Sequence, residues 1–448
     1  MDAKLRECAA LGQKDKTPAF IALIPQALSQ PDPLPDLHSL VSFVVNEESV
    51  GLVVGRQVLA EVVKALGEKT VSDHELRKKL VQDTLDLIEP RIASYVEQAN
   101  ALRFQLADLL EEEEEWSEAA RTLMGVNLDA GQRSSTDADK LRVYVRIVRL
   151  LLEDEDSVQA ETFYNRAALL VHSAGNDKET LLQFKLCQAR ISDYSRKFLE
   201  AASRYHELSY TAEIDEDERK FMLSAAVTCA VLAPAGPNRS RILASLYRDE
   251  RSAELPTFNV LSKMFLDHIL RPAEIHEFEK TLKPHQVAKI AISSNDRLSA
   301  VADEDEEAGS ADEPVSTRRG PSTVLDRAVM EHNLLASSKI YNNITFRGLG
   351  ALLDLTPGAA ETMARRMIEQ GRLRGWIDQV DRLIWFEARE DEEAQGKAGG
   401  LGDVEEAEDT GSPFTKRWDM QIRTTAAHVE SIVQHLYEKN LIHAATAA

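Results

Sequence analysis

The sequence predicts a mostly α-helical protein: a curved array of helical repeats of the TPR or HEAT type, then a winged-helix subdomain and a C-terminal helix. Three observations lead to this prediction. Apolar positions recur every 41 residues in the middle of the chain, helices and strands after residue 324 follow the winged-helix order, and an apolar stripe near the C-terminus repeats every seven residues. The 448 residues suffice for about two to four domains.

Small residues mark the repeats. Ala119, Ala160 and Ala201 are 41 residues apart, and a further 41 residues lead to Ile242. These spacings place one stripe on each of two helices per repeat, and a small side chain lets the neighbouring helix approach closely. An unrelated helical bundle with a chance period is the alternative. Apolar residues also recur at fixed distances from these four positions. Four residues after them come Leu123, Tyr164, Tyr205 and Leu246. Fifteen residues before them come Phe104, Val145, Leu186 and Val227, and twelve residues before them come Ala107, Val148, Ala189 and Ala230.

The flanks of these repeats also read as helical. Residues 35–100 carry helical apolar spacing from Leu52 and Val53 to Val62 and Val63. In residues 258–290 an apolar face precedes Pro272, which is expected to open the next helix. Residues 1–290 are therefore predicted to form one curved array whose terminal repeats are less regular, as capping repeats are.

Two acidic stretches interrupt the chain. The first lies in a predicted linker at residues 291–323, where the composition changes at 301–320. The second, residues 389–413, holds nine acids, two bases and five glycines. Such stretches cannot bury enough apolar area to offset chain entropy, so both are predicted to be solvated insertions. A regulatory role and a plain insertion both remain open.

Residues 324–388 are predicted to form the winged helix. The order is a helix from Asp326 to Ser338, a short extended stretch at residues 340–345, and a second helix from Phe346 to Leu353. Thr356-Pro357 is an N-cap followed by proline, which opens a third helix that stops at Gly371. Residues 376–379 and 383–387 then flank Val380-Asp381-Arg382 as a β-hairpin.

The charge of this subdomain favours protein docking over DNA binding. Residues 346–388 hold six bases and six acids, so little affinity would come from counterion release at a phosphate backbone. The hairpin carries Trp376 and Trp385, and large aromatics are enriched at protein interfaces. DNA binding, with Arg365, Arg366, Arg372 and Arg374 reading a groove from the third helix, is the less favoured alternative.

One further helix is predicted within residues 414–448, from Trp418 to Leu441. Ile422, Val429 and Leu436 are seven residues apart, with Ala426, Ile432 and Val433 beside them. This seam is typical of a coiled coil, and pairing with similar helices of partner chains is the favoured interpretation. Folding back onto the winged helix is the alternative.

Composition excludes several classes of function. The 75 acids and 53 bases give a formal net charge of −22, which disfavours nucleic-acid and anionic membrane partners. Three cysteines without a CxxC pair indicate a reducing compartment. Neither a signal peptide nor an 18-residue apolar run is present, so a soluble intracellular protein is expected. The sequence shows no zinc-binding histidine pair, phosphate loop or nucleophile elbow, so catalytic residues, metals and cofactors are predicted to be none.

A helical array followed by a winged helix is the layout of the PCI family, whose members are scaffold subunits of the proteasome lid, the COP9 signalosome and translation initiation factor 3. Residues 325–335 and 338–346 resemble the COP9 signalosome subunit 4 family. So do Gly371-Arg372-Leu373, residues 376–381, and Trp418-Asp419 at the start of the last helix. The resemblance covers roughly residues 35–445.

The resemblance implies a non-catalytic scaffold of a complex that removes the ubiquitin-like modifier NEDD8 from cullins in the cytoplasm and nucleus. The implied partners are the PCI scaffold subunits, the catalytic isopeptidase pair and neddylated cullin–RING ligases, with neither nucleic acid nor membrane. In the family, winged helices associate side by side and C-terminal helices form one bundle. The implied interface residues are Trp376, Ile377, Leu383 and Trp385 for the wing, and Ile422, Val429, Ile432, Val433 and Leu436 for the bundle. A scaffold subunit of the proteasome lid is the nearest alternative, and a winged-helix regulator that binds nucleic acid is a more distant one.

Overall fold

The computed structural model describes residues 2–30, 32–47, 49–67, 73–128, 136–175, 177–290, 318–387 and 413–439. The chain divides into two compact units, Met1–Glu387 and Ala388–Ala448. The first unit holds the helical array and the winged helix, and the second holds one long helix. The centres of both acidic stretches lie outside the described residues.

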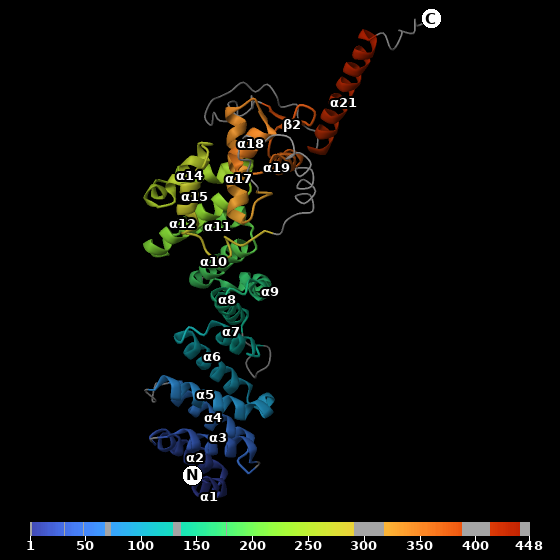
Figure 1. The fold of residues 1–448 in the computed structure, drawn as a ribbon. Coiled ribbons are helices and arrows are strands. Elements are labelled where there is room, and N and C mark those ends of the chain that lie inside the picture. Colours follow the sequence, from blue (N-terminus) through green and yellow to red (C-terminus); the bar gives the residue numbers. More distant parts are fainter. Residues whose placement is uncertain are drawn as a thin grey trace, which may run out of the picture. The chain divides into compact units, whose positions relative to one another are not determined.

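The N-terminal part of the array is a series of helices that stack in chain order (Figure 1). Alternate helices pack against each other, α2 on α4 and α3 on α5, and their buried faces join one core with the first repeats. The elements are α1 (Asp2–Ala10), α2 (Gln13–Leu28), α3 (Leu34–Asn46), α4 (Leu52–Gly67), α5 (His74–Ile88) and the 3₁₀ turn η1 (Glu89–Ser94). Leu52 and Val53 are exposed in the first turn of α4, so the buried stripe of that helix begins at Val54.

The 41-residue period predicted from the alanines is present as helix hairpins. Each hairpin consists of a long helix of 17 residues followed by a shorter one. The first three of the four hairpins begin 41 residues apart. The pairs are α6 (Val96–Glu112) with α7 (Trp116–Met124), α8 (Asp137–Glu153) with α9 (Ser157–Leu170), α10 (Lys178–Tyr194) with α11 (Phe198–Ser209), and α12 (Glu216–Leu232) with α13 (Pro237–Tyr247). Ala119, Ala160 and Ala201 are fully buried, as the close-packing argument requires.

The turn inside each of the first three hairpins has the same backbone geometry. Glu114, Glu155 and Arg196 are 41 residues apart and all have φ near +60°. The amide of the next residue donates to a carbonyl five residues earlier, as Glu115 N–H does to Leu110 O at 2.9 Å. This is the Schellman ending of a helix, which glycine usually makes, so three non-glycine residues hold a left-handed conformation here.

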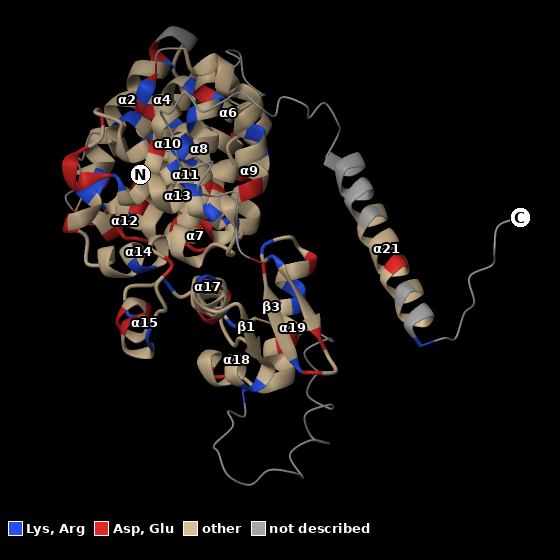
Figure 2. Cartoon of the chain, turned by 90° about the horizontal axis from the view of Figure 1, so that it is seen from above, with Lys and Arg blue, Asp and Glu red and all other residues tan. Residues whose placement is uncertain are grey.

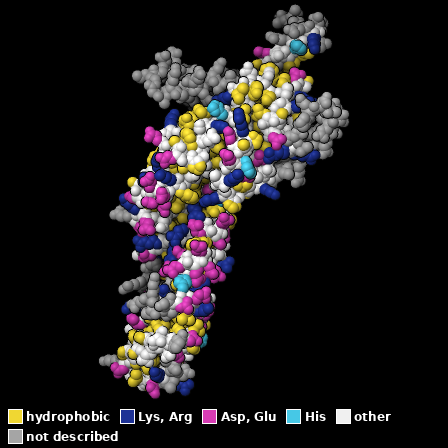
Figure 3. All heavy atoms as spheres, turned by 60° about the vertical axis from the view of Figure 1, so that its left-hand side comes forward, with side chains coloured by type: hydrophobic (Ala, Val, Ile, Leu, Met, Phe, Trp, Pro, Cys, Tyr) yellow, Lys and Arg dark blue, Asp and Glu magenta, His cyan; other side chains and the backbone are white. Residues whose placement is uncertain are grey.

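Ion pairs connect successive long helices across the repeats. Arg146 of α8 contacts Asp108 and Glu111 of α6 at 2.5 and 2.6 Å, and Arg190 of α10 contacts Glu153 of α8 at 2.6 Å. Acidic and basic side chains are accordingly interspersed over the middle of the array (Figure 3). Most of these side chains are partly exposed, so each pair contributes less than about 1 kcal/mol.

The array ends in shorter elements: η3 (Glu250–Glu254), α14 (Phe258–Phe265) and α15 (Pro272–Glu279). A further 3₁₀ turn, η2 (Val171–Ala174), lies between α9 and α10. Pro272 opens α15 at the first helical position, as predicted. Leu261 and Met264 of α14 are buried in a second core with α11 and α12.

The winged helix has the predicted order: α17 (Val324–Ile340), β1 (Asn343–Thr345), α18 (Phe346–Leu353), α19 (Pro357–Glu369), β2 (Gly375–Asp378) and β3 (Leu383–Phe386). The first helix is two residues longer at each end than predicted, and the strand after it is correspondingly shorter. The strands form an antiparallel sheet in the order β1-β3-β2. Thr356 caps α19, and Gly371 with φ +67° ends it in a Schellman motif.

The second unit contains α21 (Pro413–Glu438), which begins five residues before the predicted helix start. Its predicted end at Leu441 lies outside the described residues. Among the helices that the structure describes, none is both long and apolar enough to cross a membrane.

Candidate interaction surfaces

The hairpin of β2 and β3, residues 375–386, is the wing of the winged helix, and it carries two stacked tryptophans. Trp376 of β2 pairs with Trp385 of β3, and their rings stack with centroids 5.9 Å apart and planes 9° from parallel. Leu383 lies on the same face, because it pairs with Asp378, two residues after Trp376. Trp376 is 52% exposed, so this outer face offers aromatic surface to a partner.

Ile377 occupies the opposite face of the same strand. It pairs with Ile384, which is fully buried, and it packs against the core of the winged helix. The structure therefore brings Trp376, Leu383 and Trp385 together and places Ile377 beneath them, where it supports the wing rather than forming part of its outer face.

Local features hold the hairpin in this geometry. A Cβ on Gly375 would lie 2.2 Å from the carbonyl oxygen of Trp385, so only glycine fits where the strands meet. At the other end, Asp378 Oδ1 accepts hydrogen bonds from the amides of Val380 and Asp381 at 2.9 and 3.2 Å. This turn leaves the Val380 side chain 92% exposed.

The third helix of the winged helix is only partly basic. Arg365 is paired with Glu361 one turn earlier, and the Glu361 carboxylate also accepts from Gln379 of the hairpin at 2.9 Å. Figure 2 shows basic positions along α19 and acidic positions in the same subdomain. This arrangement offers less free positive charge than a DNA-reading helix uses.

A polar junction connects the winged helix to the array. Glu331 of α17 is buried and accepts from both terminal nitrogens of Arg372, which follows α19. The same carboxylate accepts from the amide of Ala235 at 3.2 Å, and Arg372 donates to the Ala235 carbonyl at 3.3 Å. Ala235 lies between α12 and α13, so one carboxylate joins the winged helix to the last regular hairpin.

The next residue, His332, is fully buried and its protonation state follows from its partners. Nε2 lies 2.8 Å from the carbonyl oxygen of His268, so Nε2 must donate, and Nδ1 then accepts from Arg239 at 3.3 Å. Burial, and secondarily the charge of Arg239, lower the pKa of His332 to about 4. The imidazole is therefore neutral at physiological pH.

Asn333 completes the junction through two hydrogen bonds to the backbone of Leu270. Its Oδ1 accepts from the Leu270 amide at 2.9 Å, and its Nδ2 donates to the Leu270 carbonyl at 3.2 Å. Sequence analysis did not assign a role to residues 331–333. The available signal was three consecutive polar residues inside the otherwise apolar stretch 328–336 of α17. We refer to Glu331, His332, Asn333, Arg239 and Arg372 as the polar junction.

Within the second unit, no other described element packs against the apolar seam of α21. Ile422, Val429 and Ile432 are each more than half exposed, Val433 is 38% exposed, and Leu436 is half-buried. A helix with this stripe gains stability mainly by packing it against another apolar surface. All five predicted bundle residues thus lie on one helix and are at least partly accessible.

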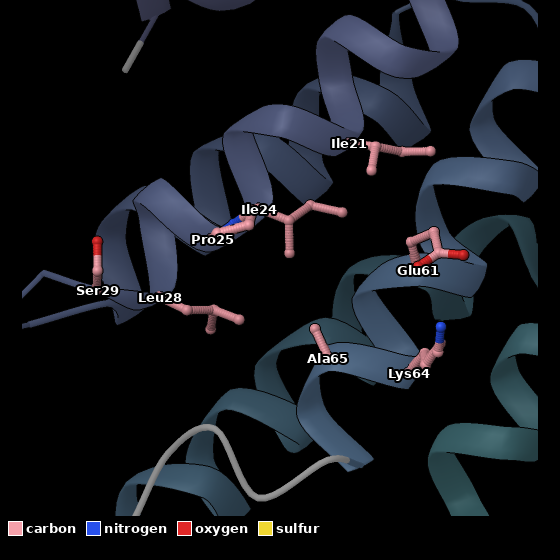
Figure 4. A pocket seen from close by; sticks show the side chains of 8 residues that line it. All are labelled: Ile21, Ile24, Pro25, Leu28, Ser29, Glu61, Lys64 and Ala65. Carbon is pink, nitrogen blue, oxygen red and sulfur yellow. The ribbon is translucent and has the colours of Figure 1, made fainter.

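An apolar groove lies between α2 and α4 (Figure 4). Its volume is about 360 Å³. Ile21, Ile24 and Leu28 line it from α2, and Ala65 lines it from α4 with Glu61 and Lys64 at the edge. Pro25 has no N–H to donate to the carbonyl of Ile21 within the helix. The groove can accept apolar side chains, but its lining contains no nucleophile with a neighbouring base.

Two of the three cysteines, Cys187 and Cys229, are buried and are not activated as nucleophiles. Burial raises the pKa of the Cys187 thiol to about 11, and Cys229 is also buried, with a pKa well above its usual value. Both thiols are neutral and inaccessible at physiological pH. In the part of the chain that the structure describes, no group of three or more His, Cys, Asp or Glu side chains could hold a metal ion.

Comparison with known proteins finds a matching family model for part of the helical array and another for the winged helix. The family described as PSMD12/CSN4, N-terminal, matches residues 8–217, and the PCI domain matches residues 319–388. Similar proteins include the COP9 signalosome complex subunit 4 of Drosophila melanogaster, which is 40% identical over 89% of this chain and 84% of its own length. The proteins of that name from Arabidopsis thaliana and Emericella nidulans are 39% and 38% identical, over 98% and 93% of this chain and 99% and 91% of their own lengths.

The alignment with the Arabidopsis thaliana protein covers 98% of this chain, so it includes the array, the winged helix and the C-terminal helix. The chain therefore belongs to the COP9 signalosome complex subunit 4 family.

Proposed function

We propose that this chain is a non-catalytic scaffold subunit of a COP9 signalosome. The observation that carries the proposal is its near full-length similarity to proteins named as subunit 4 of that complex. Two apolar surfaces with exposed side chains support it: the Trp376–Trp385 face of the wing and the seam of α21. The first would contact neighbouring winged-helix subunits side by side, and the second would join a bundle of subunit helices.

Within such a complex the array would help to recognise neddylated cullin–RING ligases, and a different subunit would remove NEDD8. The buried, neutral thiols of Cys187 and Cys229 agree with a chain that does not carry the isopeptidase chemistry. The same partners are expected in the cytoplasm and the nucleus.

Native purification of the tagged full-length chain tests the assignment. We expect the other signalosome subunits and cullins to co-purify, together with isopeptidase activity on neddylated cullin. Recovery of proteasome ATPase-ring components in their place would support the proteasome-lid alternative and overturn the assignment. Saturable binding to duplex DNA at 150 mM salt would instead favour the nucleic-acid regulator.

Matched variants test the two surfaces separately. Replacing Trp376 and Trp385 by Ser should reduce recovery of the neighbouring scaffold subunits, whereas Val380→Ser, in the exposed turn of the same hairpin, should not. Replacing Val429 and Ile432 by Asp should abolish incorporation, whereas Ala427→Asp, on the opposite face of α21, should not. Normal incorporation of the surface variants would show that these faces are not the interfaces.

A further inference from the structure

A groove of about 320 Å³ lies where the end of α7 meets α8 and α9. The buried side chains of Leu123, Val126 and Ile147 line it. The rings of Tyr144 from α8 and Phe163 from α9 also line it, with their centroids 6.2 Å apart. Protein sites that take ligand groups have volumes of about 300–1,000 Å³. This groove, called the α9 groove below, can therefore accept apolar or aromatic side chains.

The backbone that lines the α9 groove at residues 125–128 is held in place by side chains of α6. Asn100 Nδ2 donates to the carbonyl of Asn127 at 2.9 Å, and Asn100 Oδ1 accepts from the amide of Asn127 at 3.1 Å. Arg103 donates to the carbonyl of Gly125. Because these contacts fix the lining in advance, a ligand would spend little of its binding free energy on ordering the groove.

The charge at the α9 groove is positive. Arg166 is the one charged side chain among the described residues that line it, and its guanidinium lies 4.9 Å from the centroid of the Phe163 ring. Among the described residues, neither Arg166 nor Arg103 forms an ion pair with a carboxylate. A guanidinium has five N–H donors, so these contacts leave donors for an acidic group of a ligand. On α8 and α10, by contrast, every arginine is paired with a carboxylate: Arg142, Arg146, Arg149 and Arg190.

Exposed apolar side chains continue along α9 outside the groove. Val158, Thr162, Arg166 and Leu169 follow one another at spacings of four, four and three residues, so they lie along one face of the helix. Val158 and Leu169 are 75% and 80% exposed. This face is about 16 Å long, since an α-helix rises about 1.5 Å per residue. A ligand that contacts both the groove and this face has the length of a protein segment rather than of a small molecule.

We propose that the α9 groove binds a segment of a partner protein in which an apolar or aromatic side chain lies within a few residues of a carboxylate. The apolar side chain would pack against Tyr144 and Phe163, and the carboxylate would pair with Arg166. The charge of Arg166 and Arg103 disfavours a basic segment at the same place. The site lies on the helical array, and the proposal does not depend on the scaffold role proposed above.

The test exposes the purified full-length chain to an array of octapeptides in a Gly-Ser background at 150 mM NaCl. Each peptide holds one Leu, Ile, Phe or Trp and one Asp or Glu, separated by at most three residues. Matched peptides carry Asn or Gln in place of the acid, or Ala in place of the apolar residue. We expect saturable binding of at least one peptide, measured by isothermal calorimetry, and binding of its matched peptides that is weaker by about fivefold or more. Absence of saturable binding across the array, or equal binding of the amide-substituted peptides, would overturn the proposal.

Variants at exposed positions distinguish the α9 groove from the rest of the surface. Arg166→Gln should weaken binding of the acidic peptide about fivefold or more, and Leu169→Ser should weaken it about threefold or more. Arg142→Gln is the matched control, because Arg142 is an exposed arginine of α8 that pairs with Asp177 and does not line the groove. An equal loss in Arg142→Gln would contradict the proposal. So would self-association of the chain in sedimentation velocity that Arg166→Gln abolishes, since that result assigns the groove to a second copy of the chain.

Discussion

Replacement of Arg372 by Ala should detach the winged helix from the array locally. In the present structure Arg372 and Glu331 have side chains that are 16% and 6% exposed. Removing the arginine leaves the Glu331 carboxylate buried with only the Ala235 amide as a described partner, and it removes the donor to the Ala235 carbonyl. The variant thus leaves a buried charge unpaired.

The magnitude follows from this burial. Loss of one partner from a fully buried ion pair costs about 3–5 kcal/mol, and residual exposure of Arg372 reduces this to about 2–4 kcal/mol. Since 1.4 kcal/mol corresponds to a factor of ten, local opening should become about 30- to 700-fold more frequent. Replacing both residues, Glu331→Gln with Arg372→Met, removes the charge and should restore most of the stability.

Hydrogen exchange of backbone amides in the full-length chain measures this effect, because repeat arrays open locally rather than in one step. Exchange should accelerate in α17 and α19 and remain unchanged in α8, which is remote from the junction in sequence. An acceleration in Arg372→Ala below about threefold would refute the reasoning. The reasoning would also be refuted if the double variant lost as much stability as Glu331→Gln and Arg372→Met lose together as single variants. Such additivity would mean that the two residues are not coupled.

Three other predictions concern the buried histidine, the turns and the repeat alanines. The pKa of His332 is about 4 in the folded chain and 6.5 for the free side chain. Between these pH values the unfolded state binds more protons than the folded state, so the free energy of unfolding decreases as the pH falls from 6.5 to 4. The decrease is about 2 kcal/mol at pH 5. His332→Gln should flatten this dependence in pH-dependent hydrogen exchange of α17, and an unchanged slope would contradict it. Glu155→Gly should relieve the left-handed strain and stabilise the α8–α9 hairpin by up to about 1 kcal/mol, seen as slower exchange in α8, and faster exchange would contradict it. Ala160→Leu should overpack the same hairpin and cost about 1–3 kcal/mol in thermal denaturation, whereas Val158→Leu, at a 75% exposed position of the same helix, should be neutral.

The features that could be predicted from the sequence are those that depend on the spacing of neighbouring residues along the chain. The 41-residue period locates the hairpins because the buried alanines must recur wherever two helices approach closely. The winged helix was predictable from its caps, since Thr356-Pro357 and Gly371 mark the two ends of α19. The prediction named Trp376 and Ile377 together, for docking or for support of the wing, and strand alternation then places them on opposite faces.

The polar junction was not predicted, because its members are far apart in the sequence. Glu331 accepts a hydrogen bond from the amide of Ala235, 96 residues earlier, and His332 accepts one from Arg239, 93 residues earlier. No periodicity connects such residues, and each of them alone reads as an ordinary surface charge. The left-handed turns were also missed, because Glu114, Glu155 and Arg196 are not the glycines that usually mark a helix end.

The ion pairs between successive long helices also bear on how the array can bend. Each pair contributes little, and each connects only adjacent repeats, such as Arg190 to Glu153. A change in the angle between two repeats can therefore exchange one weak contact for another while both hairpins stay folded. Bending of the array should therefore be distributed over many repeats. Its stiffness should fall as ionic strength rises, because salt screens these ion pairs.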